Sequence, residues 1–558
     1  MSQQQKSQMK QLITTCGFNK NNKQCKGDNK MGNMLGVMFD SSRNGVLSVK
    51  TVKEYANILK KMGYNTMLLY IEDTYEIKSQ PYFGHLRGRY TEEEMKEMDK
   101  YCQSIGMELI PCIQTLAHLE AIFKWTDVYS DINDCDSILL AGDDKTYELI
   151  DDMISTLAGC FTSKKIHIGM DEAYRVGTGK YQKLNGICDR FDIINNHLHK
   201  VCDIASKYNV EPMIWSDMFC KLAMNTESQY ETADTSKILE KAKLPENVSL
   251  VYWDYYSTDY KRYTDNIKTN KVFGRDVYFA GGAWAWKGIA PDNDFSIRTT
   301  KTALEACRNE GVENVFITVW GDDGNECPKS AIFPSLMYAA EVYNGNTDME
   351  SIKAKFKDIT GCNFDDFMLL DKLDWVNGEH TEDRMSKNFL YDDVFMGVWD
   401  GNCKAEYCDF YSDLAKKMLS ISDKGDFEYL FDCYGKFARV LEIKATLGIR
   451  IREAYLESNK DKLKEIIKDM EELETRISSF HLAYQKAWFK ENKPQGFEIM
   501  DIRLGGLKQR VISCKERLKQ YINGDITEIP ELCEAVLKKT NGIYWSRLVS
   551  AGRISMEL

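Results

Sequence analysis

Long apolar segments are missing from this chain of 558 residues. No run of apolar residues reaches the roughly 18 residues that a membrane-spanning helix needs. The first 30 residues are polar throughout and lack the apolar core of a secretory signal. We therefore expect a protein without membrane contacts that is located in the cytoplasm.

An excess of positive charge is also absent. Lys and Arg number 73 against 85 Asp and Glu, which gives a formal net charge of −12. A nucleic-acid-binding protein needs clustered Lys and Arg to contact phosphates. The charge balance therefore argues against nucleic acid as a partner, although it says nothing about the fold.

Residue patterns typical of metal and cofactor sites are scarce. Only seven His occur, and the close pair His197 and His199 falls in a helical stretch, where the two side chains face different directions. The 17 Cys are scattered, odd in number and contain no C-x-x-C, so we expect mostly reduced, buried thiols. No G-x-G-x-x-G follows the first apolar run, and no G-x-S-x-G occurs. We expect neither a metal nor an organic cofactor.

Short apolar runs alternate with longer helical segments from about residue 33. Near-continuous apolar runs predict parallel strands that are buried on both faces. Eight strand–helix units predict a closed (β/α)₈ TIM barrel of the α/β class, with an open doubly wound sheet as the alternative. The runs are 33–39, 65–71, 107–114, 166–170, 211–217, 248–256, 276–284 and 314–322.

The residue pattern changes after about residue 345, where apolar runs typical of β-strands largely stop. The segment 460–492 has a long 3.6-residue periodicity with mixed charge, which is typical of an amphipathic helix. We therefore divide the chain into an N-terminal segment 1–32, a barrel 33–345 and a mainly α-helical C-terminal domain 346–558. A homodimer contact through that domain is left open.

Acidic and aromatic residues gather where the predicted strands end. In a TIM barrel these carboxyl ends form the active site. Aromatic faces stack on the apolar faces of sugar rings, while carboxylates and Arg bind hydroxyl groups, so the set indicates a sugar site. Its members are Asp40, Arg43, Glu72, Asp73, His118, Asp171, Glu172, Trp215, Trp253, Trp284, Trp286 and Trp320.

The adjacent acids Asp171 and Glu172 are the most informative pair. Two carboxyls that act as nucleophile and acid in an ordinary retaining glycosidase stand about 5 Å apart on different strands, which neighbours cannot easily reproduce. Neighbours can serve a substrate that carries its own nucleophile, the carbonyl oxygen of a 2-acetamido group. The shorter Asp171 would orient the acetamido N–H, and the longer Glu172 would act as general acid and base. A helix cap or a solvated turn is the simpler alternative for the same two residues.

The stretch His167-Ile-Gly-Met-Asp-Glu172 resembles the strand-4 motif of glycoside hydrolase family 20, the β-N-acetylhexosaminidases. The resemblance implies Asp171 as the acetamido-orienting residue and Glu172 as the general acid/base. It further implies that Arg43 in "DSSR" holds the outer hydroxyls of the sugar, and that His118 supports the catalytic Glu together with an acid after strand 2. For that acid we name Asp73, with Glu72 as the alternative. Other implied pocket residues are Trp215, Trp253, Trp320 and Asp322, with Asp322 on the hydroxyls at C4 and C6.

The chain also departs from the common family pattern. Thirty-two residues are too few for the small α/β domain that usually precedes the barrel. The Tyr-x-Asp expected on strand 7 is replaced by "GGAWAW", so we name Tyr255 as the hydroxyl that contacts the acetamido group and add Trp286 to the sugar-binding candidates. The order of domains resembles a bacterial subgroup in which a helical domain follows the barrel directly.

Together these features predict an exo-β-N-acetylhexosaminidase that removes terminal β-linked GlcNAc or GalNAc with retention, through an oxazolinium intermediate. Two alternatives stay open. One is a retaining glycosidase that uses an enzyme carboxylate as nucleophile. The other is a catalytically inactive carbohydrate-binding protein.

Overall fold

The computed structural model describes residues 34–231, 235–376, 378 and 384–537. The predicted N-terminal segment 1–32 lies outside these residues. Among the described helices, none combines the length with the apolar character that crossing a bilayer requires. The fifteen cysteines in the described part of the chain are all free.

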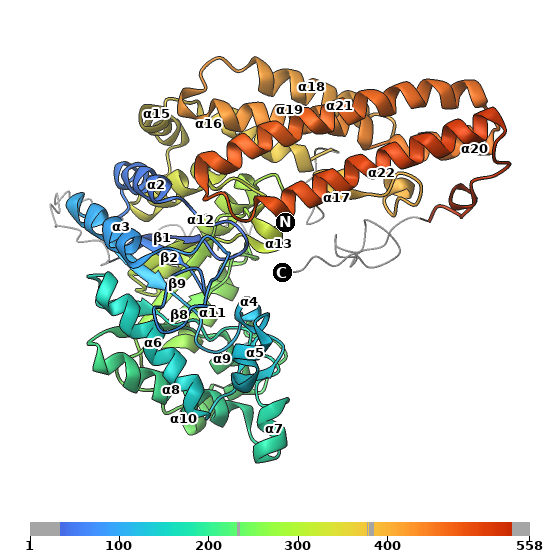
Figure 1. Ribbon diagram of the computed structural model, residues 1–558. Coiled ribbons are helices and arrows are strands. Elements are labelled where there is room, and N and C mark those ends of the chain that lie inside the picture. Colours follow the sequence, from blue (N-terminus) through green and yellow to red (C-terminus); the bar gives the residue numbers. More distant parts are fainter. Residues whose placement is uncertain (1–33, 232–234, 377, 379–383, 538–558) are drawn as a thin grey trace, which may run out of the picture. The chain divides into compact units, whose positions relative to one another are not determined.

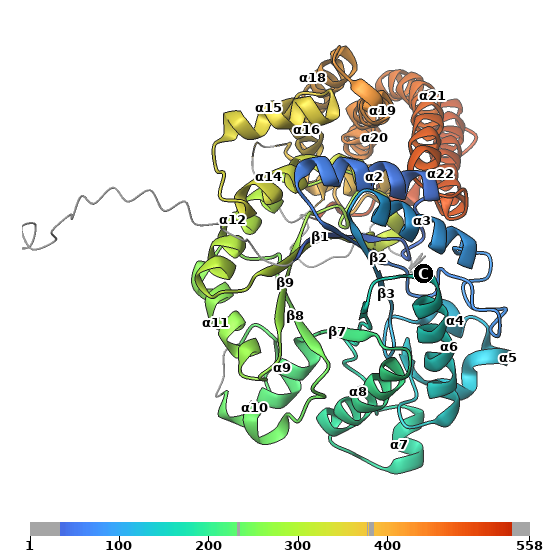
Figure 2. The ribbon, with the colours of Figure 1, turned by 90° about the vertical axis from the view of Figure 1, so that its left-hand side faces the viewer.

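Eight parallel strands in the described residues close into a barrel, as predicted (Figures 1 and 2). Their order around the barrel is β1-β10-β9-β8-β7-β6-β3-β2, so that β1 pairs with both β2 and β10. Each predicted apolar run overlaps one strand. The strands are β1 (Met34–Asp40), β2 (Thr66–Tyr70), β3 (Glu108–Cys112), β6 (Lys165–His167), β7 (Glu211–Trp215), β8 (Ser249–Trp253), β9 (Val277–Gly282) and β10 (Asn314–Val319).

Helices cover the outside of the barrel (Figure 2). Their ends follow local sequence signals. Ser48 caps the first helix by accepting from the Thr51 N–H, and Gly63 ends it with φ 106°, a conformation that glycine adopts at little cost. The main barrel helices are α2 (Val49–Met62), α3 (Glu92–Ser104), α6 (Asp144–Cys160), α8 (Arg190–Lys207), α9 (Asp217–Met224), α10 (Ser236–Lys241), α11 (Tyr260–Lys271), α12 (Asn293–Asn309) and α14 (Phe333–Tyr343).

Several short helices and strands lie in the loops that follow the carboxyl ends of the barrel strands. The connection from β3 to β6 contains a small antiparallel pair, and a short turn follows β10. The short elements are α4 (Glu120–Phe123), α5 (Thr126–Tyr129), η1 (Ser130–Ile132), β4 (Asn133–Cys135), β5 (Ile138–Leu139), α7 (Lys180–Asn185), α13 (Asp322–Asn325) and η2 (Lys329–Ile332). Among them, α13 contributes one residue to the pocket described below, and α4 and α13 both contribute to the cavity beside it.

The described residues after α14 are mainly helical, as predicted. The long helices α21 and α22 run side by side (Figure 1). The exact boundary near residue 345 stays a prediction. The elements are α15 (Met349–Thr360), α16 (Phe364–Met368), η3 (Leu370–Asp374), α17 (Met385–Tyr391), η4 (Asp400–Asn402), α18 (Tyr407–Ser420), η5 (Gly425–Phe427), α19 (Glu428–Lys444), α20 (Leu447–Leu456), α21 (Lys460–Glu491), α22 (Phe497–Asn523) and η6 (Pro530–Leu532).

The turn between α21 and α22 is attached to the loop that follows β1. Leu47 and Asn492 form an antiparallel bridge, and the Lys493 N–H donates to the Val46 carbonyl at 2.7 Å. Backbone pairing of this kind satisfies groups that burial would otherwise leave without partners. The helical region is therefore joined to the barrel at the edge where the strands end.

Glu491, the last residue of α21, adds a buried carboxylate to this attachment. It accepts hydrogen bonds from Ser330 Oγ at 2.5 Å, from the Lys329 N–H at 2.7 Å and from the Tyr429 hydroxyl at 2.9 Å. The Lys329 ammonium in turn donates to the carbonyl of Trp320 at 2.9 Å, at the end of β10. One carboxylate thus connects α21, α19 and the segment after strand β10.

A first prediction concerns this carboxylate. Replacing Glu491 by Ala removes the acceptor of the three shortest of these buried hydrogen bonds. A buried donor that is left unsatisfied costs about 1–3 kcal/mol. We expect the free energy of unfolding to fall by about 3 kcal/mol. Urea unfolding followed by tryptophan fluorescence measures the change.

The matched control is Glu472→Ala on the same helix. Its carboxylate is 56% exposed and pairs with Arg476 at 2.9 Å, so its loss should change stability by less than about 1 kcal/mol. Equal unfolding midpoints for the two variants would contradict the role given to Glu491.

Candidate active site

A pocket of about 80 Å³ opens where the barrel strands end. It continues the aromatic and apolar cluster that fills the barrel interior, in which Trp215, Trp284 and Trp320 pack with side chains such as Met38 and Phe316. The lining combines aromatic and charged side chains. It consists of Arg43, His118, Asp171, Glu172, Trp215, Trp253, Tyr255, Tyr256, Trp320 and Asp322.

The backbone after β6 explains how two neighbouring acids reach one pocket. The strand ends at His167, earlier than the predicted Met170, and Gly169, Met170 and Glu172 follow with φ of 73°, 75° and 50°. A Cβ on Gly169 would come within 2.0 Å of Gln114 Oε1, so this position requires glycine. Because the chain leaves strand geometry here, Asp171 and Glu172 are not forced to opposite faces.

Gln114 holds the strained turn in place. Its Oε1 accepts the Met170 N–H at 3.1 Å, and its Nε2 donates to Asp171 Oδ1 at 2.7 Å. The same Nε2 also donates to the Tyr70 hydroxyl at 2.8 Å. Left-handed non-glycine residues cost about 1–3 kcal/mol each, and such strain persists only where surrounding contacts enforce it.

Asp217 fixes the backbone of Glu172. Its Oδ2 accepts the Glu172 N–H at 3.0 Å, and its Oδ1 lies 3.4 Å from the indole N–H of Trp253. Burial, followed by the neighbouring charge of Asp171, raises the pKa of Asp217 to about 8. Asp217 therefore orients both the backbone of Glu172 and the ring of Trp253.

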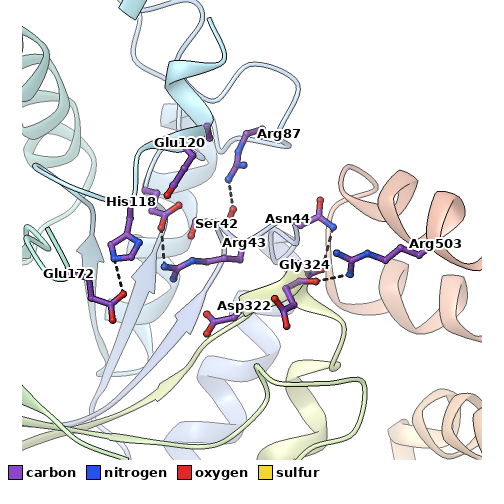
Figure 3. A pocket seen from close by; sticks show the side chains of 13 residues that line it. Ser42, Arg43, Asn44, Arg87, His118, Glu120, Glu172, Asp322, Gly324 and Arg503 are labelled. Carbon is purple, nitrogen blue, oxygen red and sulfur yellow. Dashed lines mark hydrogen bonds and ion pairs between the residues drawn. The ribbon is translucent and has the colours of Figure 1, made fainter. Parts of the chain in front are cut away.

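His118 faces both acids. Its Nε2 lies 3.3 Å from Asp171 Oδ2. The same Nε2 lies 3.5 Å from Glu172 Oε2 (Figure 3). Burial alone would lower the pKa of His118, but the Asp171 carboxylate raises it to about 9. The imidazole is therefore positively charged at neutral pH.

The two acids have opposite pKa shifts. Burial would raise the pKa of Asp171, but His118 and the Gln114 hydrogen bond outweigh it and lower the value to about 2. Burial and then the charge of Asp171 raise the pKa of Glu172 above its ordinary value. Asp171 is 12% exposed and Glu172 is 41% exposed, so the acid that protonates more readily stands on the open side of the pocket.

Arg43 and Asp322 form the charged end of the pocket. The Arg43 guanidinium pairs with Asp40 at 3.3 Å and with Glu72 at 3.4 Å, and it lies 5.0 Å from the ring centroids of Tyr70 and Trp320. Burial, opposed by Arg43, raises the pKa of Asp322 to about 6. A fixed guanidinium can donate to neighbouring sugar hydroxyls, and a carboxylate beside it can accept from them.

The acid after strand β2 requires a correction. Asp73, the residue named from the sequence, does not line the pocket, because its carboxylate pairs with Arg87 at 3.1 Å. Glu72, the alternative, lines an adjoining cavity and accepts the Tyr70 hydroxyl at 2.8 Å. The positive φ of 30° at Glu72 marks the backbone turn that separates the two side chains. Burial raises the pKa of Glu72 to about 7.

Three predicted tryptophans line the pocket together with Tyr255. Trp253 stacks on Tyr255 at a centroid distance of 5.3 Å, and the Trp320 indole N–H donates to the Tyr255 hydroxyl at 3.0 Å. Trp215 packs against the imidazole of His167 at 4.3 Å. Burial lowers the pKa of His167 to about 3, so that ring is neutral and its Nδ1 accepts the Gly169 N–H at 3.1 Å.

Trp286 also needs a correction, because the structure does not bring it into the pocket lining. It is 3% exposed and packs edge-to-face on Tyr255 at 5.4 Å. Trp284 lies beside it at 4.8 Å and donates its indole N–H to the Tyr255 carbonyl at 2.9 Å. The rings of Trp284 and Trp286 therefore contact Tyr255 without lining the pocket themselves.

Sequence reasoning missed several residues of the site. Gln114 and Asp217 are the last residues of the predicted runs 107–114 and 211–217, which is the signal that could have identified them. Tyr256 stands next to a named residue, and Tyr70 ends strand β2. Arg503 gave no signal, because it lies on α22, far from the barrel in sequence.

A second cavity of about 290 Å³ adjoins the pocket and shares four of its residues (Figure 3). Its wall includes Arg503, so the helical C-terminal region reaches the site. Trp399 lines neither cavity and is buried. The second cavity is lined by Ser42, Arg43, Asn44, Glu72, Arg87, His118, Glu120, Ala121, Glu172, Asp322, Asp323, Gly324 and Arg503.

Among the described residues, one group of side chains in this pocket is of the kind that can bind a metal ion. One ligand atom each from His118, Asp171 and Glu172 lies within 4.8 Å of the others. A protonated imidazole, which the raised pKa of His118 favours, offers donors on both nitrogens and no lone pair to a metal. The arrangement therefore fits an ion pair between His118 and the acids, and the expectation of no metal stays a prediction.

Sequence comparisons identify relatives of both regions. Residues 365–542 match the Glycoside Hydrolase 20C C-terminal domain. Hexosaminidase D of Homo sapiens is 26% identical over 231 residues, which span 37% of this chain and 42% of that protein. Hexosaminidase D of Bos taurus is 24% identical over 271 residues, which span 46% of this chain and 70% of that protein.

Among solved structures, the chain resembles a family 20 exo β-N-acetylglucosaminidase from Vibrio harveyi. The match has a TM-score of 0.46 and 16% identity, and it covers 61% of this chain and 58% of the other. The catalytic-domain model of glycosyl hydrolase family 20 matches residues 35–321, which is more than half of the chain. This protein therefore belongs to glycosyl hydrolase family 20.

Proposed function

We propose that the protein is an exo-β-N-acetylhexosaminidase that hydrolyses terminal β-linked GlcNAc or GalNAc. The observation that carries the proposal is the pair of adjacent acids with opposite pKa shifts in one aromatic pocket. Family membership and the hexosaminidase names of the matched relatives support the same substrate class.

The first half of the reaction forms a cyclic intermediate. The carbonyl oxygen of the acetamido group attacks the anomeric carbon, and the bond from that carbon to the leaving oxygen breaks. Glu172 transfers its proton to the leaving oxygen, which a raised pKa favours. Asp171, ionised because of its low pKa, accepts the acetamido N–H and stabilises the positive charge of the oxazolinium ring.

The second half opens this ring. The Glu172 carboxylate takes a proton from a water molecule, and the water oxygen attacks the anomeric carbon from the side of the departed group. The bond to the acetamido oxygen breaks, the amide is restored, and Glu172 is protonated again. Two inversions at the anomeric carbon give overall retention.

The remaining residues of the pocket bind and orient the sugar. Trp215, Trp253 and Trp320 surround the apolar faces of the ring, and Tyr255 contacts the acetamido group. Arg43 and Asp322 bind the outer hydroxyls at the charged end. His118 keeps Asp171 ionised and stays within 3.5 Å of Glu172.

A cytoplasmic location is part of the proposal. Fifteen free cysteines in the described residues suit a reducing compartment. Cell fractionation with an antibody to the chain tests this, and recovery in the extracellular fraction would refute it. The homodimer stays a prediction that sedimentation can test.

The nature of the nucleophile separates the proposal from its rivals. A substrate in which hydroxyl replaces the 2-acetamido group should be turned over at least about 10⁵-fold more slowly, since well-placed internal nucleophiles reach effective molarities of about 10⁵–10⁸ M. Release of nitrophenol from both aryl glycosides measures the ratio. Equal rates, or a glycosyl group bonded to a side chain, would favour an enzyme nucleophile. No release from either glycoside would favour a sugar-binding protein.

Glu172→Gln tests the acid. We expect a loss of about 10²–10⁴ in kcat/KM on substrates with poor leaving groups such as chitobiose. Dinitrophenyl glycosides need no protonation, so their first step should be nearly unchanged in a pre-steady-state burst. An equal loss on both substrates would remove Glu172 from the role of acid.

Asp171→Asn tests the coupling between the two acids. In the wild type, kcat/KM should fall as the pH rises through the pKa of Glu172, because the protonated form is needed. Since the charge of Asp171 raises that pKa, its removal should move this alkaline limb to lower pH. The rate should also fall on both classes of leaving group. A pH–rate profile that keeps its alkaline limb unchanged would contradict the coupling.

A further inference from the structure

The turn that carries Asp322 has an unfavourable backbone. Asp323, Gly324 and Asn325 follow one another with φ of 59°, 102° and 60°. Three successive residues in the left-handed region are costly, because only glycine adopts it without steric penalty. Contacts from the surroundings must therefore hold the turn, and with it the side chain of Asp322 at the pocket.

Arg503 provides the most direct of these contacts. It projects from α22 toward the turn (Figure 3), and its Nη1 donates to the Asp323 carbonyl at 2.6 Å and to Glu326 Oε1 at 2.8 Å. A Cβ placed on Gly324 would lie 3.2 Å from the same guanidinium. The Arg503 side chain is only 7% exposed, so the contact excludes water. One guanidinium thus binds both the backbone carbonyl of Asp323 in the turn and the carboxylate of Glu326 at its end.

Glu326, at the end of the turn, is surrounded by groups of the helical region. Its carboxylate pairs with the Lys387 ammonium at 2.6 Å and accepts the Tyr391 hydroxyl at 2.9 Å. Its carbonyl accepts the Tyr484 hydroxyl at 2.6 Å. Burial alone would raise the pKa of Glu326, but Lys387 and Arg503 hold it below its ordinary value. Glu326 is therefore a buried, ionised carboxylate that fixes the end of the turn to the helical region.

The loop that carries Arg43 is attached to the same helices. Asn44 Nδ2 donates to the Gly324 carbonyl at 3.2 Å and to the Gly496 carbonyl at 2.8 Å, just before α22. On the barrel side, the Gly321 N–H donates to Asp40 Oδ2 at 2.9 Å. Both residues of the charged end of the pocket, Arg43 and Asp322, thus depend on segments that contact the start of α22.

We infer that Arg503 is a positioning residue for Asp322, so that the helical C-terminal region controls recognition of the outer sugar hydroxyls. This inference rests on the proposed function. Arg503 acts through the backbone of residues 323–326, and it sets the angle at which Asp322 meets the hydroxyls at C4 and C6.

A double-mutant cycle with Arg503→Met and Asp322→Ala tests the inference. On nitrophenyl β-GlcNAc, Arg503→Met should lower kcat/KM about tenfold or more, mainly through KM, since a hydrogen bond to a charged group is weakened in the ground state and transition state alike. In the Asp322→Ala background the same substitution should change kcat/KM by less than about twofold, because the two residues act as a unit. Full additivity of the two losses would overturn the inference.

Deoxy sugars provide a readout that a merely structural role would not move. The 4-deoxy and 6-deoxy glycosides are first compared in the wild type and in Asp322→Ala, which shows which hydroxyl Asp322 binds. On the analogue that lacks this hydroxyl, the loss caused by Arg503→Met should shrink to about twofold or less. A loss that is equal on the parent and on this analogue would overturn the inference.

Arg510→Met is the matched control. Arg510 lies on the same helix and pairs with a buried acid, Asp393, at 2.7 and 3.0 Å, but it makes no contact with the turn after β10. It should destabilise the helical region and leave KM unchanged. A rise in KM as large as that of Arg503→Met would assign the effect to general loosening and overturn the inference.

Arg503→Lys covers the case in which Arg503→Met does not fold. It keeps the positive charge beside Glu326 but loses the planar fork, so KM should rise with the melting temperature largely preserved. Wild-type KM in this variant would overturn the inference. Wild-type turnover of the aryl glycoside is measured first, so failure of the proposed function is recognised separately.

Discussion

The ion pair between Asp171 and His118 is the interaction on which the site depends. It keeps one carboxylate ionised inside an aromatic pocket, at 3.3 Å from a charged imidazole. Burial and then this fixed negative charge raise the pKa of the adjacent Glu172. Two chemically similar acids thereby acquire pKa values shifted in opposite directions by their surroundings, as catalysis with one base and one acid requires.

This arrangement needs a backbone that no regular strand provides. Gly169, Met170 and Glu172 adopt left-handed conformations, and so do Glu72 and His118. The cost is offset by buried amide and carboxylate groups, chiefly Gln114 and Asp217, which bind the N–H groups of the turn. Strain at the ends of β2, β3 and β6 is therefore part of how the pocket brings its acids together.

The helical region belongs to the same system. The turn between α21 and α22 pairs with the loop after β1, and Glu491 connects α21 to the segment after β10. Strands β1 and β10 are neighbours in the barrel and carry the charged end of the pocket. The loops after β1 and β10 are both attached to one pair of long helices. This attachment limits their motion at the place where the sugar hydroxyls would bind.

Local pattern alone predicted the barrel, because apolar strand runs and capped amphipathic helices are properties of neighbouring residues. It also placed Asp171, Glu172, Arg43, His118, Trp215, Trp253 and Trp320 at strand ends, and the resemblance to family 20 added Tyr255 and Asp322. The structure brings all nine to one pocket. It could not choose between Glu72 and Asp73, since that depends on a single backbone turn. It also could not recognise that Trp286 lies behind Tyr255.

Gln114 and Asp217 were within reach of the pattern, whereas Arg503 was not. A contact between residue 503 and residue 323 depends on how α22 packs against the barrel, and no local periodicity encodes that distance. The sequence by itself determined the strands, the helices and the chemistry available at the strand ends. Only the tertiary structure decided which of these groups meet and which are ionised, because charge and burial act through space and not along the chain.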